Sequence, residues 1–326
     1  MDMTSAITAE PLGPDESDWE TLLARSTNGT LFHDLGFLRY HPQNRFRFHH
    51  LIFRQGGRPI ALLPGGLAGS AERPTFCSPL GASIGGFAVE PGLRAEAAVQ
   101  LVKALQDHAI RSNWGAVEIT LPPYCYSFET SGVMEFALFC SGFRLTHRWL
   151  CHVLPLIEGA GFEQCFRGRQ ISYVRAAQRK GMTGVEGGAK RLDDFMKVFR
   201  DTYERHGVAA THTPEEIRDL LVRFPDRIRI HLAVLGGEVM AGLLIFQLSP
   251  TVANTFYICA STQFAAERGV SFLVADLIRR LSGSACRYLD FGPSASDMNF
   301  NTGVVFFKEG LGAFGQCRDR WRWDSA

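Results

Sequence analysis

The sequence predicts an α/β protein made of two tandem copies of one domain, each with a mixed central sheet flanked by helices. Its 326 residues are enough for two domains. Two segments, residues 47–63 and 229–244, each have the pattern of a strand, a Gly-Gly turn and a second strand. A helical stretch and a further strand follow each hairpin. The long spacing between the copies favours a duplicated domain over a solenoid, whose units are much shorter.

The same order of elements is expected in both halves. The predicted helix and the strand after it lie at residues 95–111 and 116–121, and again at 271–281 and 286–291. Periodicity breaks between Pro155 and Gly161, which marks a domain boundary. The predicted domains are therefore residues 1–155 and 162–326.

Two further helices are expected in the second half. Residues 192–207 carry apolar side chains at three- and four-residue spacing, with Asp193 and Asp194 at the N-terminal end and Gly207 as a stop, which is typical of a scaffold helix. Residues 170–180 predict a helix in a strongly basic stretch. No acidic residue lies between Glu163 and Glu186, and the positive charges there are Arg167, Arg169, Arg175, Arg179 and Lys180. This stretch is either a phosphate-binding surface or an ordinary solvated helix face.

The C-terminal region places charge directly after an apolar run. Residues 304–307 predict a buried strand that ends at Lys308 and Glu309, followed by permissive backbone at Gly310 and Gly312. The ends of strands are where sheet proteins place chemistry. Lys308 is therefore a candidate functional residue, and the alternative is a charge that protects a strand end from aggregation.

Composition excludes several classes of protein. With 46% hydrophobic and 21% charged residues the chain is typical of soluble globular proteins, and its longest apolar run, near residues 239–246, is too short to span a membrane. The acidic N-terminal stretch does not resemble a secretory signal, so we expect a cytoplasmic protein. The eight cysteines form no C-x-x-C pair, and the histidine spacings match no metal motif, so we expect reduced thiols and no metal.

Several motifs resemble, in order, those of the Fem family and its GNAT-type relatives. They are RAAQRKGM (175–182), FRDTYERHG (199–207), GEVMAG (237–242), YLDFG (288–292) and FKEGLG (307–312). The resemblance covers the second half of the chain, and the first half matches only as a degenerate repeat. It implies two tandem GNAT-like domains and transfer of an acyl or aminoacyl group to an amine of a small molecule, a polysaccharide or a cell-envelope precursor.

The resemblance and the chemistry of acyl transfer together suggest roles for particular residues. Direct attack by an amine needs a deprotonated nucleophile and a stabilised oxyanion, but no covalent intermediate. Lys308 is assigned to charge stabilisation at the donor carbonyl or at the donor's phosphate. Asp290 either orients or deprotonates the amine or caps a turn. Arg205 either holds an acceptor phosphate or compensates a helix dipole. Arg175 and Arg179 are candidates for holding phosphate.

Tyr257 and Tyr288 either contact the leaving group or belong to the core. The donor is expected to be acyl-CoA, including acetyl-CoA, or aminoacyl-tRNA. In the family a glycine-rich helix start holds the pyrophosphate of coenzyme A, whereas here the stretch has one glycine and an acidic Glu267. The residues left for a cofactor are Arg268, Gly269 and Ser271.

The sequence also permits a protein of a different class, a non-catalytic module of the same fold that binds a nucleotide-sugar or RNA phosphate through residues 167–180. An enzyme requires Lys308 and Asp290 to meet at one site, whereas a binding module requires only the basic face.

Overall fold

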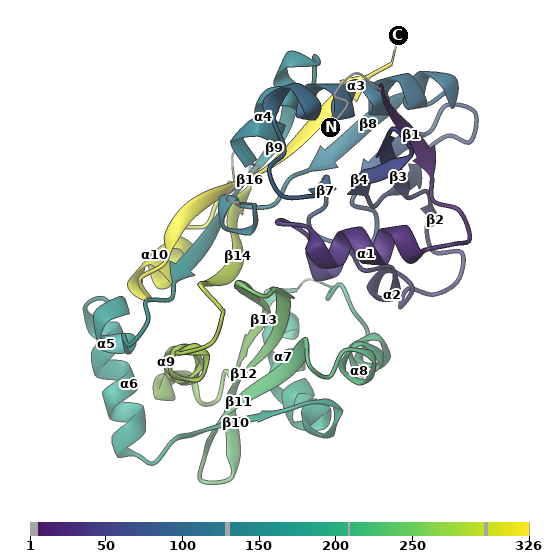
Figure 1. Cartoon of the computed structure of the whole chain (residues 1–326). Helices are drawn as coiled ribbons and strands as arrows, with labels where there is room; N and C mark the ends of the chain where they lie inside the picture. The colour runs from purple at the N-terminus through teal and green to yellow at the C-terminus, as the bar shows by residue number, and fades with distance from the viewer. Residues whose placement is uncertain (1–5, 128–130, 208, 297–298, 326) are drawn as a thin grey trace. The chain divides into compact units, whose positions relative to one another are not determined.

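The computed structural model describes residues 6–127, 131–207, 209–296 and 299–325, with the side chains of residues 131 and 206 left aside. The chain divides into two compact units, which are treated separately below (Figure 1). Unit 1 contains the described residues up to Trp149 together with those from Cys317 onward, and unit 2 is Leu150–Gln316. The unit boundaries fall inside two long strands, β9 (Arg144–Pro155) and β16 (Phe314–Asp324), so each of these strands belongs partly to unit 1 and partly to unit 2.

Unit 1 contains two sheets. The first has the order β1-β3-β4-β7, with strands Ile7–Pro11, Leu51–Gln55, Arg58–Leu63 and Ala88–Val89. The second has the order β9-β16-β8-β6-β5-β2, with β8 at Ala116–Thr120, β6 at Thr75–Ser78, β5 at Gly66–Ala68 and β2 at Arg47–Phe48. The helices are α1 (Ser17–Arg25), α2 (Leu35–Leu38), α3 (Ala95–Arg111) and α4 (Ser131–Cys140), with 3-10 turns at Leu31–His33 and Tyr124–Tyr126. The core of the unit is apolar and includes the inner faces of α3 and β8.

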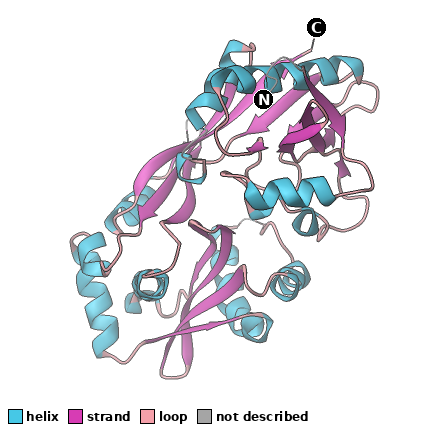
Figure 2. Ribbon diagram, viewed as in Figure 1, coloured by secondary structure: helices cyan, strands magenta, loops and turns pink. Residues whose placement is uncertain are grey.

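Unit 2 is one mixed sheet with helices on it (Figure 2). Its strand order is β10-β11-β12-β13-β14-β9-β16, with β10 at Thr183–Gly187, β11 at Ile228–Leu235, β12 at Glu238–Ser249, β13 at Val252–Ala260 and β14 at Tyr288–Ser296, and β15 (Asn299–Phe300) pairs with β14. The helices are α5 (Phe162–Cys165), α6 (Arg169–Arg179), α7 (Leu192–His206), α8 (Pro214–Arg223), α9 (Gly269–Leu281) and α10 (Thr302–Gly310), with 3-10 turns at Ala189–Arg191 and Ala265–Glu267.

The predicted repeat is confirmed at its hairpins. Gly56 and Gly57 join β3 to β4 with φ of 57° and 82°, and Gly236 and Gly237 join β11 to β12 with 61° and 88°. Both positions of each turn thus have positive φ, which glycine adopts at little cost. Each hairpin also has a register shift two residues before its first strand ends. In each unit a helix then connects two parallel strands, β6-α3-β8 and β13-α9-β14.

The division of the chain differs from the predicted domains at both boundaries. Unit 2 begins at Leu150, inside β9, and the residues from Cys317 onward belong to unit 1. The reason is strand pairing: β16 pairs with β8 from Arg320↔Thr120 to Asp324↔Ala116. These long-range contacts were not visible in the periodicity of the sequence.

The predicted strand at residues 304–307 is wrong, because these residues lie in helix α10. The side chain of Asn301 caps this helix by accepting a hydrogen bond from Val304 N at 3.1 Å. Val305 and Lys308, three positions apart, are buried, whereas Phe306 is 78% exposed. That is the period of a helix, which a short apolar run does not distinguish from a strand.

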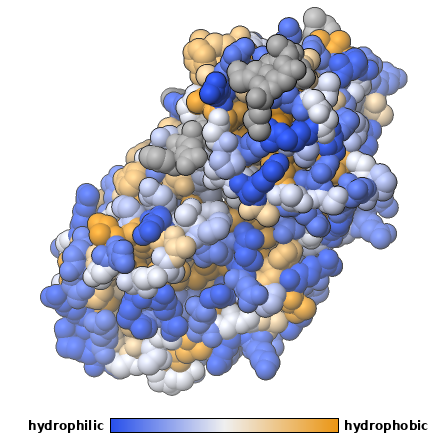
Figure 3. Space-filling view, in the orientation of Figure 1, coloured by the Kyte–Doolittle hydropathy of each residue, from blue (hydrophilic) through white to orange (hydrophobic). Residues whose placement is uncertain are grey.

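The helical predictions elsewhere are confirmed. The helix expected at residues 95–111 is α3, that at 192–207 is α7 with Gly207 as its left-handed C-cap, and that at 170–180 is α6 shifted by one residue. No helix among the described residues is long and apolar enough to cross a membrane. The face shown in Figure 3 is mostly hydrophilic, with apolar side chains scattered across it.

Candidate functional site

The sheet of unit 2 opens between its two parallel strands. β13 and β14 pair only from Val252↔Tyr288 to Asn254↔Asp290, although both strands continue beyond this point. No further ladder pair joins β13 to β14 in the described part of the chain. Beyond Asn254 and Asp290, the backbone N–H and C=O groups of β13 and β14 therefore do not bond to each other. Such a break in an α/β sheet is a usual place for a ligand.

Asp290 stands at this point of separation and is 4% exposed. Its Oδ2 accepts a hydrogen bond from Asn254 Nδ2 at 2.9 Å, and its Oδ1 accepts one from Gly292 N at 2.7 Å. The second contact closes a turn in which Gly292 has φ of +67°. Of the two roles left open by the sequence, the hydrogen bond from Gly292 N is that of a turn cap. Each carboxylate oxygen has a second lone pair, so these contacts still leave acceptor sites for an amine.

Lys308 reaches the same stretch of β14 from helix α10. It is 5% exposed, and its Nζ donates to the carbonyl oxygens of Phe291 at 2.7 Å, Gly292 at 3.0 Å and Pro293 at 3.0 Å. An ammonium has three hydrogens, so all of them have acceptors. Burial lowers the pKa of Lys308 to about 8, although the negative charge of Asp290 acts in the opposite direction. The two predicted catalytic residues thus meet at residues 290–293.

A buried histidine that the sequence did not indicate lies beside this lysine. His152 Nδ1 is 2.8 Å from Ser294 Oγ, and its Nε2 is 3.8 Å from Glu309 Oε1. Burial, and then the nearby positive charge of Lys308, lower the pKa of His152. The residue sits in the middle of the long strand β9, where no motif distinguished it from other buried strand residues.

The two predicted tyrosines occupy different environments. Tyr257 is buried, and its hydroxyl accepts a hydrogen bond from His212 N at 3.2 Å and lies 2.7 Å from His212 Nδ1. It packs edge-on against Phe199 and Tyr203 of α7, as expected for a core residue. Tyr288 is half-buried at the start of β14.

Arg205 is exposed near the C-terminal end of α7. The pKa of Asp201 is lowered by hydrogen bonds from Thr262 and, to a smaller extent, by Arg205. This position matches the dipole-compensating role that the sequence left open for Arg205.

The predicted cofactor loop at the start of α9 is contacted by side chains of α6 and by Lys180, the C-cap residue of that helix. Ser271 Oγ donates to Gln170 Oε1 at 2.6 Å, and the Arg268 guanidinium lies 4.9 Å from the centre of the Tyr173 ring. At the other end of the loop Lys180 Nζ is 2.6 Å and 2.8 Å from the two carboxylate oxygens of Glu267. A Cβ at Gly269 would lie 2.9 Å from Ala241 Cβ and 3.0 Å from Met240 Cβ, so close packing on β12 explains this glycine.

The basic residues and the buried apolar residues of α6 lie on different faces of the helix. Val174 and Ala177 are buried on the side that packs on α9, whereas the arginines at positions 169, 175 and 179 are exposed. Arg175 has one weak ion pair, 3.9 Å to Glu163. Arg175 and Arg179 lie four residues apart and share one side of the helix, where they form an exposed cationic pair, and Arg169 lies six residues before Arg175.

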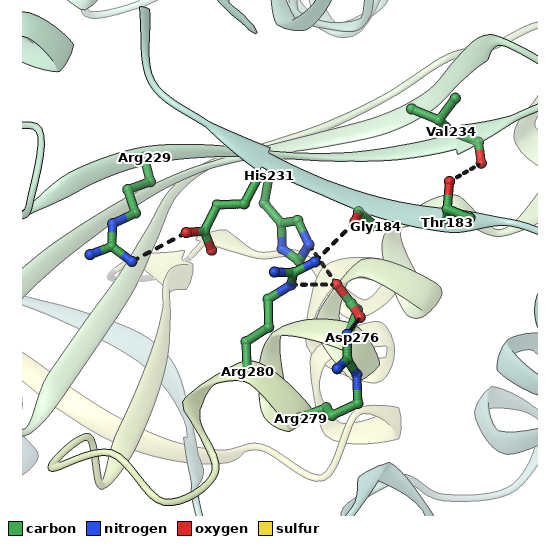
Figure 4. Close-up of polar contacts among 9 residues, drawn as sticks. Thr183, Gly184, Arg229, His231, Val234, Asp276, Arg279 and Arg280 are labelled. Atoms are coloured by element: carbon green, nitrogen blue, oxygen red, sulfur yellow. Dashed lines mark hydrogen bonds and ion pairs between the residues drawn. The ribbon is translucent and has the colours of Figure 1, made fainter.

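A second charge, the largely buried carboxylate of Asp276, lies further along α9 (Figure 4). Asp276 accepts hydrogen bonds from His231 Nε2 at 2.8 Å and from Arg280 Nε at 2.7 Å, and it also pairs with Arg279. His231 lies on β11, opposite Glu186 of β10. Among the described residues no three His, Cys, Asp or Glu side chains gather as a metal site would require.

The sequence and the fold were compared with those of known proteins. A family model of the acetyltransferase (GNAT) domain matches residues 168–300. FemX is 12% identical, with 97% of both chains covered and a TM-score of 0.74. A tandem GNAT protein from the clavulanic acid biosynthesis pathway is 12% identical over 98% of this chain and 99% of that chain, with a TM-score of 0.55. L-PGS from Bacillus licheniformis is 13% identical over 96% and 93%, with a TM-score of 0.57.

At these identities the structural likeness is one of fold, and no curated protein sequence matches the chain. The molecule is thus an α/β protein with a Fem-like tandem GNAT fold. Its residues 168–300 match the model of the acetyltransferase (GNAT) domain family, which the order of motifs resembles.

Proposed function

We propose that the protein is an N-acyltransferase whose acceptor is an amine of a small molecule, a polysaccharide or a cell-envelope precursor. The observation that carries this proposal is the meeting of Lys308 with residues 290–293, where β13 and β14 separate within a GNAT domain. The neutral amine attacks the donor carbonyl directly and forms the new C–N bond, while the positive charge of Lys308 offsets the charge that develops on the carbonyl oxygen. The C–O bond of an aminoacyl ester, or the C–S bond of a thioester, then breaks, and the leaving oxygen or sulfur takes up the proton that the amine loses. All three hydrogens of this ammonium are bonded in the structure, so direct contact with the oxygen requires the release of one carbonyl.

The contacts of α6 favour aminoacyl-tRNA over acyl-CoA as the donor. Coenzyme A would place its pyrophosphate at the start of α9, where Gln170 and Lys180 already bond to Ser271 and Glu267. The carboxylate of Glu267 would also repel a phosphate there. The exposed arginines of α6 suit a phosphodiester chain instead. A charged-tRNA donor would in turn fit the expected cytoplasmic location.

The test is a transfer assay with purified full-length protein, a panel of amines and two donors, acetyl-CoA and a mixture of charged tRNAs. We expect amide formation with charged tRNA that is lost in Lys308→Met. Transfer from acetyl-CoA alone would overturn the choice of donor. Absence of transfer from both donors to every amine would count against the proposal that the protein is an N-acyltransferase.

A non-catalytic binding module is the second candidate function. The specific observation in its favour is that both carboxylate oxygens of Asp290 and every hydrogen of Lys308 already have partners. In that case charged tRNA or a nucleotide-sugar would bind without turnover, and Lys308→Met would leave binding unchanged.

A further inference from the structure

His152 and Ser294 form a buried pair on two neighbouring strands of unit 2, β9 and β14. Their exposed fractions are 1% and 6%, and the imidazole Nδ1 is 2.8 Å from the hydroxyl oxygen. No other hydrogen bond joins this hydroxyl to a residue that the structure describes. A hydroxyl has one hydrogen and two lone pairs, so Ser294 can accept a hydrogen bond from a further donor while it bonds to His152.

Ser294 lies in the part of β14 that has separated from β13. The ladder between these strands ends at Asp290, four residues earlier. The three carbonyls between them, those of residues 291–293, hold the ammonium of Lys308. Pro293, next to Ser294, is exposed, so this stretch of backbone reaches the surface. The hydroxyl of Ser294 is thus next to the place where Lys308 would meet the donor carbonyl.

The surroundings of His152 favour the tautomer in which Nδ1 is the basic nitrogen. Its Nε2 is 3.8 Å from Glu309 Oε1, whose negative charge attracts a hydrogen at that nitrogen. Nδ1 then has a free lone pair, so Ser294 donates its hydrogen to it.

The charges around His152 also keep the imidazole ready to accept a proton. Burial, and then the positive charge of Lys308, lower the pKa of His152 from its usual value of 6.5, while Glu309 acts in the opposite direction. Both charged groups belong to α10, and from β14 the imidazole faces the uncharged Ser294. His152 is therefore neutral at neutral pH, and Glu309 is placed to stabilise the cation that forms when it gains a proton.

We propose that Ser294 and His152 form a proton relay for amide formation, an inference that rests on the proposed N-acyltransferase function. As the amine nitrogen bonds to the donor carbonyl carbon, its excess proton passes to Ser294 Oγ, and the hydroxyl hydrogen of Ser294 passes to His152 Nδ1. The C–O or C–S bond of the donor then breaks, and the imidazolium returns a proton through Ser294 to the leaving oxygen or sulfur. The proton that the amine loses thus ends on the leaving group, and no further reactant is consumed.

The test measures kcat/KM for amide formation by the full-length protein between about pH 5 and 8, with charged tRNA or acetyl-CoA as donor and the panel of amines as acceptors. His152→Asn places a side-chain oxygen near the position of Nδ1, so it still accepts a hydrogen bond from Ser294 but takes up no proton. We expect kcat/KM to fall by about a hundredfold near pH 7.5, the lower range for a lost general base. The ratio of wild-type to variant rates should narrow as pH falls below 6.5, because the wild-type imidazole becomes protonated there.

Substitutions of Ser294 test the other half of the relay. Ser294→Ala should lower kcat/KM by a similar factor, and Ser294→Thr, which keeps a hydroxyl, should restore most of it. The double variant of His152→Asn and Ser294→Ala should be about as slow as either single variant, because two groups that act as one unit are not additive. Titration of the acceptor amine and of Lys308 is common to all variants, so it does not produce these differences.

The matched control is His147→Asn, which removes an exposed histidine from the same strand and should keep the wild-type rate and pH profile. Thermal unfolding identifies a variant that has not folded, and if His152→Asn fails in this way, the two Ser294 variants decide. Wild-type turnover in His152→Asn or Ser294→Ala, or a rate ratio that stays constant with pH, would show that the pair only anchors β14. That result would overturn the relay and leave the N-acyltransferase function in place, whereas absence of transfer by the wild type from both donors would reject both.

Discussion

Unit 2 contains two buried charges that are stabilised in different ways. Asp276 is surrounded by Arg279, Arg280 and His231, so full positive charges and a hydrogen-bond donor meet its carboxylate. Lys308 is surrounded by three backbone carbonyls, and Asp290 influences it only through its charge. One buried ion is neutralised by counter-ions, and the other is solvated by dipoles.

The pKa values show the consequence. Burial alone would raise the pKa of Asp276, but hydrogen bonds from Arg279 and Arg280 lower it to about 2. Burial lowers the pKa of Lys308 to about 8, and its surroundings do not fully offset this. Asp276 therefore keeps its charge at any physiological pH, whereas Lys308 can lose its proton just above neutrality. A residue of the second kind is suited to chemistry, and one of the first kind to holding the fold.

The largest expected effect follows from removing the charge of Lys308. Lys308→Met keeps the length of the side chain but leaves three carbonyl oxygens without their donor. We expect turnover to fall by about a hundredfold or more, the usual scale for one lost oxyanion donor. We also expect a loss of roughly 1–3 kcal/mol in the free energy of unfolding from the unpaired acceptors.

Steady-state rates and denaturant unfolding measure the two effects of Lys308→Met separately. Turnover within a factor of about three of the wild type would remove Lys308 from the mechanism, since the loss of an oxyanion donor costs far more.

The second prediction disturbs Asp276 without changing any charge. A Cβ at Gly184 would lie 2.1 Å from Asp276 Oδ2 and 3.0 Å from His231 Nε2. Gly184→Ala must therefore push the carboxylate away from its partners, and we expect roughly 2–4 kcal/mol of destabilisation, the range for breaking a buried ion-pair network.

The control for Gly184→Ala is Gly303→Ala in the first turn of α10, where a Cβ meets only Asn301 Oδ1 at 3.6 Å. This control should unfold at or above the wild-type temperature. Equal melting temperatures for the two variants would show that the Asp276 network tolerates displacement and is not structural.

The third prediction uses pH. If the ammonium form of Lys308 is active, kcat/KM should fall as pH rises through about 8. Stability moves the opposite way: the folded pKa lies below the ordinary value of 10.5, so this group's contribution increases between about 8 and 10.5 and is lost as pH falls through 8. A rate that instead rises through this range would assign Lys308 to proton removal.

The smallest effect on stability is expected from charges that are exposed. Replacement of Arg175 and Arg179 by alanine should change the free energy of unfolding by less than about 1 kcal/mol, because exposed charges contribute little. Binding of charged tRNA, followed by filter binding at several salt concentrations, should weaken and depend less on salt. Unchanged binding would show that this face of α6 is an ordinary solvated surface and does not bind phosphate.

Local signals predicted most of the scaffold. The Gly-Gly dipeptides predicted both hairpins because only glycine takes positive φ freely at two successive positions, and the structure has them at Gly56 and Gly236. Helix α7 followed from its apolar spacing and from Gly207. The segment at Val304–Phe307 failed as a strand, because four apolar residues in a row carry no period of their own.

The sequence by itself determined the class of fold, the repeat and the identity of the two residues that meet at the opening of the sheet. Only the tertiary structure decided that Lys308 binds strand carbonyls, that α6 contacts the start of α9, and that His152 lies against Ser294. The physical reason is range. Turn chemistry and periodicity act between near neighbours in the chain, whereas burial, which sets the pKa of Lys308, depends on residues brought together from distant strands and helices.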